Sequence, residues 1–240
     1  LVKDLYRQYD EAEIDLTKSN VLKNNIDKLK EPNTFTITTG QQIHLGLGPL
    51  YVLYKIFDVI AISRQLSEQY ADKQFIPVFW MATEDHDLDE IASLNYYGNQ
   101  IRWDTNQSGA VGRMNTEGVA EIFYKLIETQ RISEAQRAFL NRAAQVYHES
   151  QNLSVAFRRL LHDYLGDTGL IIIDPDSKVL KSSFTTVMID ELNHSNKRAI
   201  QKTTSRLEES GFKKQLRIKP SNLFLLQKND RIRIDKLSDI

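Results

Sequence analysis

Residues 75–81 form an uninterrupted apolar run, Phe75-Ile76-Pro77-Val78-Phe79-Trp80-Met81, which gives way at once to the polar turn Thr83–Asp87. A short apolar run of this kind is typical of a strand buried on both faces, as in a parallel sheet. Residues 34–38 alternate in polarity and are rich in β-forming residues, which predicts an earlier strand. Residues 170–173 form another apolar run and predict a third strand.

A helix is predicted between the first two strands. The glycine-containing loop 40–48 precedes Pro49, and proline favours the first helical position because its φ is fixed and its missing N–H is not needed there. The order strand, loop, helix, strand predicts the β-α-β unit of a parallel sheet. We expect this helix to be covered on more than one side, because it carries two apolar stripes. They consist of Leu50, Leu53, Phe57 and Ile60, and of Val52, Ile56 and Val59.

The remaining sequence predicts an α/β core with a helical insertion. One or two helices are expected over 3–30, and an antiparallel meander at the sheet edge over 94–97, 100–104 and 110–114. Helical patterns cover 117–129, 133–149, 153–165 and 177–210, with Ser133 and Gln136 as a capping-box pair. Further strands are predicted at 215–218, 222–227 and 231–235. We therefore divide the chain into a first part of the core (1–115), an insertion (116–166) and a continuation of the core (167–240).

Composition excludes several classes of protein. The chain has 31 basic and 32 acidic residues, so it has no general field that attracts nucleic acid. It contains no cysteine, which excludes disulfides, a thiol nucleophile and a zinc–thiolate site. No apolar stretch is long enough to span a bilayer and no signal peptide is visible, so we expect a cytoplasmic protein that binds no membrane. Because Leu1 opens directly into a helical pattern and residues 231–235 alternate close to the last residue, we expect part of a longer protein.

The loop after the first strand is the first candidate site, because ligands in open α/β sheets bind beyond the carboxyl ends of the strands. Its glycines allow a ligand close to the backbone, and the following helix offers N–H groups to a phosphate. Gln41 and Gln42 can hydrogen-bond a ribose, a base or a carbonyl, and Lys55 lies about two turns into the helix. The loop matches no Walker or G-x-G-x-x-G motif, so a tight connection with structural glycines is an equal alternative. His44 could act as a catalytic base or a phosphate ligand, but a lone loop histidine is more often solvated, and we favour that interpretation.

The second candidate site is the turn Glu84-Asp85-His86-Asp87-Leu88-Asp89-Glu90, which has five carboxylates and one imidazole. Such a cluster at a strand end can bind a divalent metal, position an amine or act as a general acid and base. Neighbouring acids favour the protonated form of His86. Alternatively, Asp87 and Asp89 cap the following helix. We expect one or two of these residues to be caps and the rest to face a cleft.

Three weaker features complete the list of candidates. Asp174 ends the strand at 170–173, so it either reaches the same cleft or forms a turn with Pro175. Trp80 and Trp103 are more typical of packing than of base stacking. Eight basic residues lie within 197–219, and such a run either contacts phosphates or forms a solvated helix face.

Several motifs together resemble the bacillithiol synthase family. The resemblance rests on the motifs of the two candidate sites and on shorter stretches farther along: Thr39–Gln42, Gly48–Tyr51, Tyr54-Lys55, Pro77–Asp87, Ser108–Gly112, Gly169–Pro175 and Asn222–Phe224. It extends over nearly the whole chain, but over about the front half of a typical member.

This resemblance implies a Rossmann-like core related to the class I nucleotidyltransferase-type ligases. Members also have a C-terminal coiled-coil arm for dimerisation, which this chain lacks, so a homodimer is implied for the full-length protein. The implied activity is the addition of L-cysteine to glucosaminyl-malate, with ATP or another adenine nucleotide activating the malyl carboxylate. The histidine-glycine signature of the related ligases has no copy here, and their second nucleotide-clamping loop is not visible.

The resemblance assigns roles to three groups of residues. The acidic turn lines the cleft and supplies the catalytic group Glu84, Asp85, His86 and Asp87. The nucleotide-binding group is Thr39, Gly40, Gln41, Gln42, Gly48 and Lys55. The substrate-binding group is Tyr51, Trp80, Asp174 and Asn222.

Two alternatives come from the residues alone. A metal-dependent hydrolase or phosphotransferase would use the Glu84–Glu90 cluster with a divalent metal. A non-catalytic nucleotide-binding or scaffolding domain would bind a ligand without turnover.

Overall fold

The computed structural model describes residues 1–96, 98–129, 131–193, 195–227 and 230–239. The chain divides into two compact units, Leu1–Ser177 and Lys178–Ile240, and each is described by itself. The three-part division predicted from the sequence (1–115, 116–166 and 167–240) stays a prediction.

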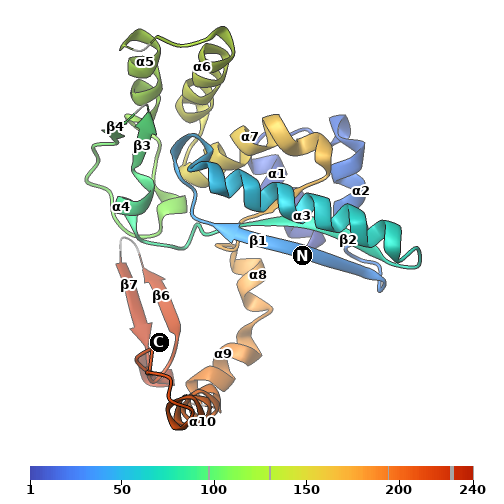
Figure 1. The fold of residues 1–240 in the computed structure, drawn as a ribbon, viewed down its shortest axis with the longest axis vertical. Coiled ribbons are helices and arrows are strands. Elements are labelled where there is room, and N and C mark those ends of the chain that lie inside the picture. The colour runs from blue at the N-terminus through green and yellow to red at the C-terminus, as the bar shows by residue number, and fades with distance from the viewer. Residues whose placement is uncertain (97, 130, 194, 228–229, 240) are drawn as a thin grey trace. The chain divides into compact units, whose positions relative to one another are not determined.

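The first unit is built on a parallel sheet of three strands (Figure 1). The strands are β1 (Thr34–Gln41), β2 (Gln74–Met81) and β5 (Ile171–Ile173), in the order β1-β2-β5. Gly40 pairs with Trp80, and Val78 pairs with Ile171. The apolar run at residues 75–81 forms the central strand β2. The three predicted strands are confirmed, and they form the parallel sheet of an α/β core.

Helix α3 (Leu50–Gln69) connects β1 to β2 and packs on both strands. Pro49, predicted as the first helical residue, is instead the N-cap with ψ 148°, and the helix begins one position later at Leu50. The stripe of Val52, Ile56 and Val59 is buried, as predicted. Of the second stripe, Ile60 is buried and Leu53 is partly buried, whereas Leu50 and Phe57 are exposed, so the described part of the chain covers only part of this stripe.

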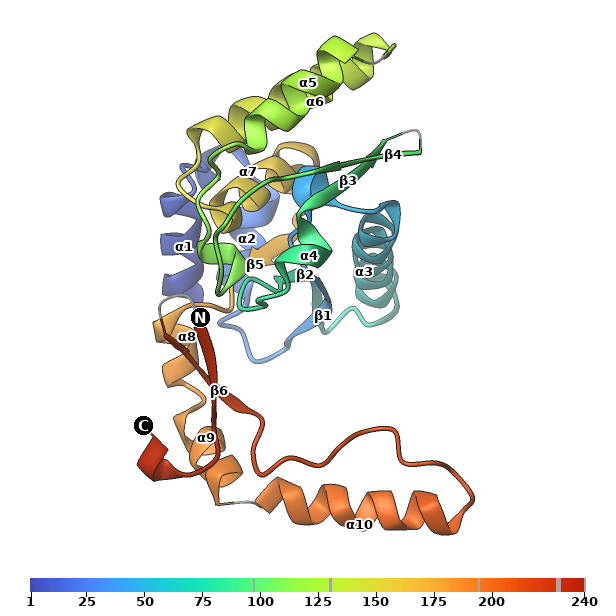
Figure 2. The ribbon, with the colours of Figure 1, turned by 90° about the vertical axis from the view of Figure 1, so that its left-hand side faces the viewer.

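Helices α1 (Val2–Glu11) and α2 (Asn20–Lys28) occupy the stretch near the N-terminus where one or two helices were expected. Leu5, Leu22 and Ile26 are fully buried. The hydroxyl of Tyr9 accepts a hydrogen bond from the Ile172 N–H, at 2.9 Å, which ties α1 to β5. Figure 2 shows α3 on one side of the three strands and the pair α1 and α2 on the other.

The predicted antiparallel meander is confirmed for its first two strands, but its position at the edge of the parallel sheet and its third strand are wrong. After the short helix α4 (Leu88–Ile91), β3 (Ser93–Tyr96) and β4 (Asn99–Arg102) form a separate antiparallel pair. The expected third strand at 110–114 contains a 3-10 turn, Val111–Arg113. The N–H groups of Val111 and Gly112 donate to Asp85 O at 2.7 Å and Thr83 O at 2.9 Å, so these donors are used by the acidic turn.

Three helices follow where they were predicted: α5 (Val119–Thr129), α6 (Glu134–Glu149) and α7 (Leu153–Leu165). The capping box of Ser133 and Gln136 is confirmed, with both reciprocal hydrogen bonds present. Phe157 of α7 stacks on Phe79 of β2 at 5.8 Å between ring centroids. Helix α7 therefore contributes to the core around the sheet.

The second unit contains α8 (Lys178–Ser182), α9 (Thr185–Leu192) and α10 (Ser195–Glu209), followed by the antiparallel pair β6 (Leu223–Gln227) and β7 (Asp230–Ile234). The predicted helical stretch 177–210 is thus interrupted, first at Ser183, directly after Ser182. Two consecutive serines favour such a break because their hydroxyls compete with the helix backbone for hydrogen bonds. The strand predicted at 215–218 is wrong: Leu216 is 78% exposed, so its alternation reflects no buried face. The last two predicted strands are confirmed.

Candidate functional site

The turns that follow β1 and β2 lie side by side. Gln41 pairs with Met81 at the ends of the two strands, and the Ala82 N–H donates to Gln41 O at 3.0 Å. Beyond the strands, Gln42 Nε2 donates to Asp85 Oδ2 at 3.2 Å. The diglutamine turn and the acidic turn therefore meet at one edge of the sheet, as the parallel order of the strands predicts.

Side chains from the first turns of α3 hold the diglutamine turn. Lys55 Nζ donates to Gly40 O at 2.6 Å and to Gln41 Oε1 at 3.1 Å. Gln41 Nε2 donates to Gln42 Oε1 at 2.6 Å and to the Tyr51 hydroxyl at 3.0 Å. Lys55 thus reaches back to the loop, and these contacts fix the orientation of both amides.

Trp80 is the exposed member of a buried strand. Its side chain is 41% exposed, although it occupies the penultimate position of the central strand β2. A Cβ at Gly40 would lie 3.2 Å from Trp80 O and 3.6 Å from its ring. The space beside Gly40 is therefore filled by Trp80, while the half-buried Thr39 precedes it. An aromatic surface at the carboxyl end of β2 remains open for stacking.

Asp85 joins the two turns electrostatically. Its Oδ1 accepts the N–H groups of His86 at 2.7 Å and Asp87 at 3.4 Å, in addition to the Gln42 bond on Oδ2. Partial burial raises the pKa of Asp85, but these hydrogen bonds outweigh it, so the pKa lies below its usual value. Asp85 is therefore ionised at neutral pH, and the half-exposed His86 places Nδ1 3.4 Å from Oδ1.

The rest of the acidic turn divides between capping and pairing. Asp87 is the N-cap of α4, accepting the Glu90 N–H at 3.1 Å, which confirms the expected cap. Asp89 is paired with Arg102 on β4. Asp87 and Asp89 therefore have structural roles within the turn and its neighbouring strand.

His44 is buried, so its interpretation as a solvated histidine is wrong. Its side chain is 8% exposed, and Nε2 lies 3.9 Å from Glu90 Oε1. Burial lowers the pKa of His44 below 6.5, although Glu90 opposes the shift. Gly48 has φ 73°, and a Cβ there would meet His44 Cβ at 2.8 Å. This glycine is thus required by its left-handed conformation and by the packing of His44.

Asp174 brings the end of β5 to the same edge. Its carboxylate accepts hydrogen bonds from Thr83 Oγ1 at 2.5 Å, from the Ser154 hydroxyl and from the Asp176 N–H at 2.9 Å. Both oxygens are therefore bonded within the protein. Asp174 acts as a brace between β5, α7 and the start of the acidic turn.

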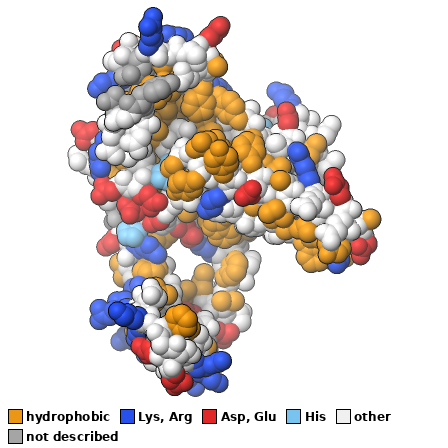
Figure 3. All heavy atoms as spheres, viewed as in Figure 1, with side chains coloured by type: hydrophobic (Ala, Val, Ile, Leu, Met, Phe, Trp, Pro, Cys, Tyr) orange, Lys and Arg blue, Asp and Glu red, His pale blue; other side chains and the backbone are white. Residues whose placement is uncertain are grey.

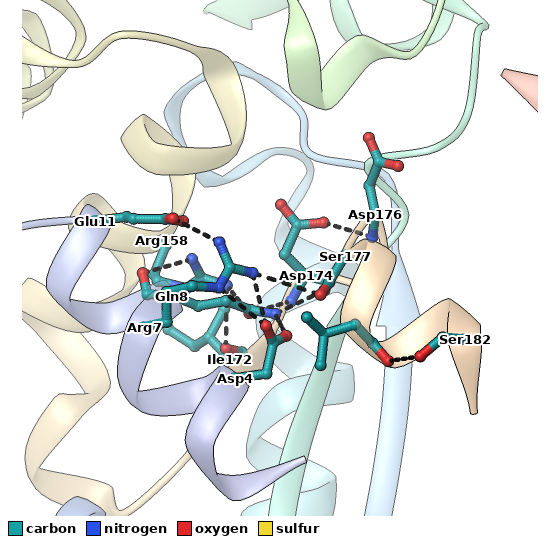
Figure 4. A network of polar contacts seen from close by, with 11 residues as sticks. Asp4, Arg7, Gln8, Glu11, Arg158, Ile172, Asp174, Asp176, Ser177 and Ser182 are labelled. Carbon is teal, nitrogen blue, oxygen red and sulfur yellow. Dashed lines mark hydrogen bonds and ion pairs between the residues drawn. The ribbon is translucent and has the colours of Figure 1, made fainter. Parts of the chain in front are cut away.

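Behind this brace lies a buried polar network that the sequence did not predict (Figure 4). The Gln8 amide donates to Asp174 O at 3.0 Å and accepts the Asp174 N–H at 2.9 Å, extending the end of β5 as a neighbouring strand would. Arg158, 2% exposed, donates to Gln8 O at 3.0 Å and to its side chain at 2.5 Å. The nearly buried Asp4 accepts from Gln8 at 2.8 Å and from Arg7 at 2.7 Å.

Arg113 is another residue that sequence reasoning missed. Its guanidinium forms two hydrogen bonds with the Asp176 carboxylate, at 2.5 and 2.7 Å. These bonds raise the pKa of Arg113, and the charges of Glu84 and Asp174 add to the effect. A cation therefore balances the acids at the ends of β2 and β5. A single arginine in a loop gives no local signal of this position.

Asn222 lies in the second unit. Its backbone N–H donates to Glu191 Oε1 at 2.9 Å, next to a cavity of 510 Å³ between α9, α10 and β6. In the first unit, a cavity of 340 Å³ adjoins the loop at Gly46 and is lined mainly by apolar side chains of β3, α5 and α6. None of the predicted site residues lines the latter cavity.

Neither a metal-binding cluster nor a membrane-spanning helix is present among the described residues. They contain no group of three or more His, Cys, Asp or Glu side chains arranged to hold a metal ion. No helix in the same part of the chain has the length and apolar character needed to cross a membrane.

Comparison with known proteins assigns the family. A sequence profile described as "Bacillithiol biosynthesis BshC, N-terminal Rossmann-like domain" matches residues 1–239. The chain belongs to this family. The family match confirms the resemblance seen in the motifs and the Rossmann-like character of the α/β core in this BshC-family chain.

Individual members of the BshC family agree. A protein of Cytophaga hutchinsonii named "Putative cysteine ligase BshC" is 37% identical over 237 residues, which are 98% of this chain and 43% of the relative. A protein of the same name from Flavobacterium johnsoniae is 39% identical over 236 residues, with the same two shares. One from Chloroherpeton thalassium is 29% identical over 246 residues, covering 95% of this chain and 44% of the relative. The chain spans less than half the length of these relatives.

Proposed function

We propose that this chain carries the substrate-binding edge of a cysteine ligase of bacillithiol biosynthesis. The full-length enzyme would join the amine of L-cysteine to the malyl carboxylate of glucosaminyl-malate, forming an amide. The observation that carries the proposal is the contact of Gln42 with Asp85 at the carboxyl end of a parallel sheet, in a chain of the BshC family. This edge is where α/β proteins bind their ligands.

The acidic turn suits the handling of an amine. Cysteine enters as an ammonium ion, and its nitrogen must lose a proton before it forms a bond to the malyl carbon. Asp85 is held ionised by its hydrogen bonds and would orient the ammonium group. His86, with Nδ1 3.4 Å from Asp85 Oδ1, would accept the proton, and Glu84 adds negative charge on the same turn. The cysteine thiol takes no part in the bond that forms.

The diglutamine turn suits a polar ligand with hydroxyl and phosphate oxygens. ATP, when bound, would supply the activation that a carboxylate needs before it accepts an amine. Gln41, Gln42 and the Tyr51 hydroxyl offer polar groups to such a ligand, while Lys55 positions the turn through Gly40 O. The exposed face of Trp80 would stack on a base or sugar.

The loop glycines do not form an open phosphate cradle. The position beside Gly40 is filled by Trp80, and that beside Gly48 is filled by His44. The proposed nucleotide site therefore depends on the side chains of Gln41, Gln42 and Lys55 rather than on glycine backbone.

The structure favours this proposal over the metal-dependent hydrolase. Asp87 caps α4 and Asp89 pairs with Arg102, and the described residues contain no group of three or more His, Cys, Asp or Glu side chains arranged to hold a metal ion. The carboxylates of the acidic turn are thus directed to separate partners rather than toward one point. A divalent cation would enter the proposed reaction only as the companion of ATP. We also propose that the full-length protein acts in the cytoplasm, where cysteine and ATP are available, and forms a homodimer through a coiled-coil arm outside this chain.

The test uses the full-length protein with glucosaminyl-malate, cysteine and ATP, with bacillithiol measured by mass spectrometry. Product is expected only when all three are present. The Asp85→Asn variant should lose most of the activity, whereas Asp72→Asn, the same change in the exposed turn before the opposite end of β2, should keep it. Binding of nucleotide and glucosaminyl-malate without any product, under varied nucleotides and metals, would instead support a non-catalytic domain.

A further inference from the structure

Helix α3 has a second apolar face that the described residues of the first unit leave exposed. Its buried side packs on β1 and β2 through Val52, Ile56 and Val59. On the outer side, Leu50 is 63% exposed, Tyr54 64% and Phe57 50%. The space-filling view shows apolar side chains gathered over this helix (Figure 3).

The outer apolar residues are spaced as in a helix-packing seam. Leu50, Tyr54, Phe57 and Ala61 are exposed and follow one another at steps of four, three and four residues. This is the a/d spacing by which one helix packs along another. None of these four residues, named the outer seam here, carries a charge. The outer seam therefore fits an apolar helix about three turns long.

The strand that precedes α3, β1, has a neighbouring strand on one side only in the described part of the chain. Among the residues that the structure describes, β1 pairs only with β2 and forms an edge of the sheet. Its eight residues, Thr34–Gln41, contain no charge and no proline, the devices that usually protect exposed edges. Single exposed apolar residues are common, but a continuous apolar stripe beside an unprotected edge marks a surface that another element covers.

We propose that the outer seam is covered by a helix from the part of the full-length protein outside residues 1–240. The chain spans 43% of the length of its relatives from Cytophaga and Flavobacterium, so more than half of such a protein remains to supply the helix. A seam about three turns long is short for holding two independent molecules together. A segment of the same polypeptide binds at high effective concentration, so a short seam is enough.

Photochemical cross-linking of the full-length protein identifies the occupant. Benzoylphenylalanine replaces Tyr54 in one variant and Phe57 in another, so that an aromatic side chain is kept. Tyr124 of α5, which is 46% exposed, serves as the matched control position. After irradiation, mass spectrometry should map the adducts of both seam positions, but not of Tyr124, to one segment outside residues 1–240.

A stability measurement complements the cross-link. Phe57→Ser should lower the Tm of the full-length protein by several degrees, because a covered phenylalanine would lose its apolar contacts. Tyr124→Ser should change the Tm by about one degree or less, as for exposed surface positions. Adducts within 1–240, whether to a second copy or to residues 178–239, would overturn the proposal. Absent adducts together with an unchanged Tm for Phe57→Ser would overturn it as well. Neither readout depends on catalytic activity.

Discussion

The side-chain amide of Gln42 donates a hydrogen bond to the carboxylate of Asp85, 3.2 Å away and 43 residues later in the chain. The two residues follow neighbouring parallel strands, so their contact depends on the register of β1 and β2. It connects the glutamines proposed to bind one substrate with the acids proposed to handle another. Changes at either residue should therefore affect both halves of the site.

The ionisation of Asp85 should be visible in stability. The folded-state pKa of Asp85 is lowered, so its contribution is present above its ordinary value of 3.8 and is lost as the pH falls through the folded pKa. Asp85→Asn should therefore be less stable than the unmodified protein at pH 7, and the difference should close in strongly acidic buffer. Urea unfolding at a series of pH values measures it. A difference that does not change with pH would show that Asp85 is not held ionised.

His44 should give a pH dependence in a higher range. Burial lowers the pKa of His44, so the unfolded chain binds more protons near its ordinary value of 6.5. The contribution of His44 to the free energy of unfolding should be fully present above pH 6.5 and should decrease as the pH falls below that value. His44→Gln should reduce this slope, and His162→Gln should reduce it further, because burial lowers the pKa of His162 as well. An unchanged slope in both variants would mean that these histidines are solvated.

Arg158 should be important for stability rather than for catalysis. Arg158→Met removes the donors to Gln8 O and to the Gln8 side chain, which lie in a buried network. A buried acceptor left without a donor costs about 1–3 kcal/mol, so we expect a loss of at least this size in the free energy of unfolding. Chemical denaturation measures it. The exposed variant Lys3→Met is the control, and equal stability of the two variants would contradict the structural role of the network.

Gly112 should be intolerant of a side chain. A Cβ at this position would lie 2.4 Å from Thr83 Cβ and 3.1 Å from Thr83 Cα, so the acidic turn would have to move. Gly112→Ala should cost about 1–3 kcal/mol in the free energy of unfolding, as overpacking usually does. It should also reduce ligase activity measured under conditions where the variant is folded. Full activity and full stability would show that the contact of this loop with Thr83 is dispensable.

Local patterns predicted most of the first unit. The apolar run ending at Met81 identifies β2 because a strand buried on both faces is apolar along its length. This pattern can be recognised without knowing which strands lie beside it. The glycine and acidic turns could be placed at the same edge because parallel strands align their carboxyl ends. The capping box at Ser133 could also be predicted from the sequence, since both of its hydrogen bonds lie within one helical turn.

Features that depend on distant residues could not be predicted. Residues 110–114 look like a strand, but their N–H groups bond Thr83 and Asp85 instead of a neighbouring strand. His44 is buried by its packing against Gly48 and the approach of Glu90, which a loop sequence does not reveal. Gln8 reaches Asp174 across 166 residues.

A double-mutant cycle tests the central claim most directly. The rate of bacillithiol formation from glucosaminyl-malate, cysteine and ATP is measured for full-length Gln42→Ala, Asp85→Asn and the double variant, with Asp72→Asn as control. If the two turns form one site, each single change lowers kcat/KM by about tenfold or more, equivalent to about 1.4 kcal/mol. The kcat/KM of the double variant is then only slightly lower than that of the less active single variant. Folded single variants that keep the unmodified rate would contradict it.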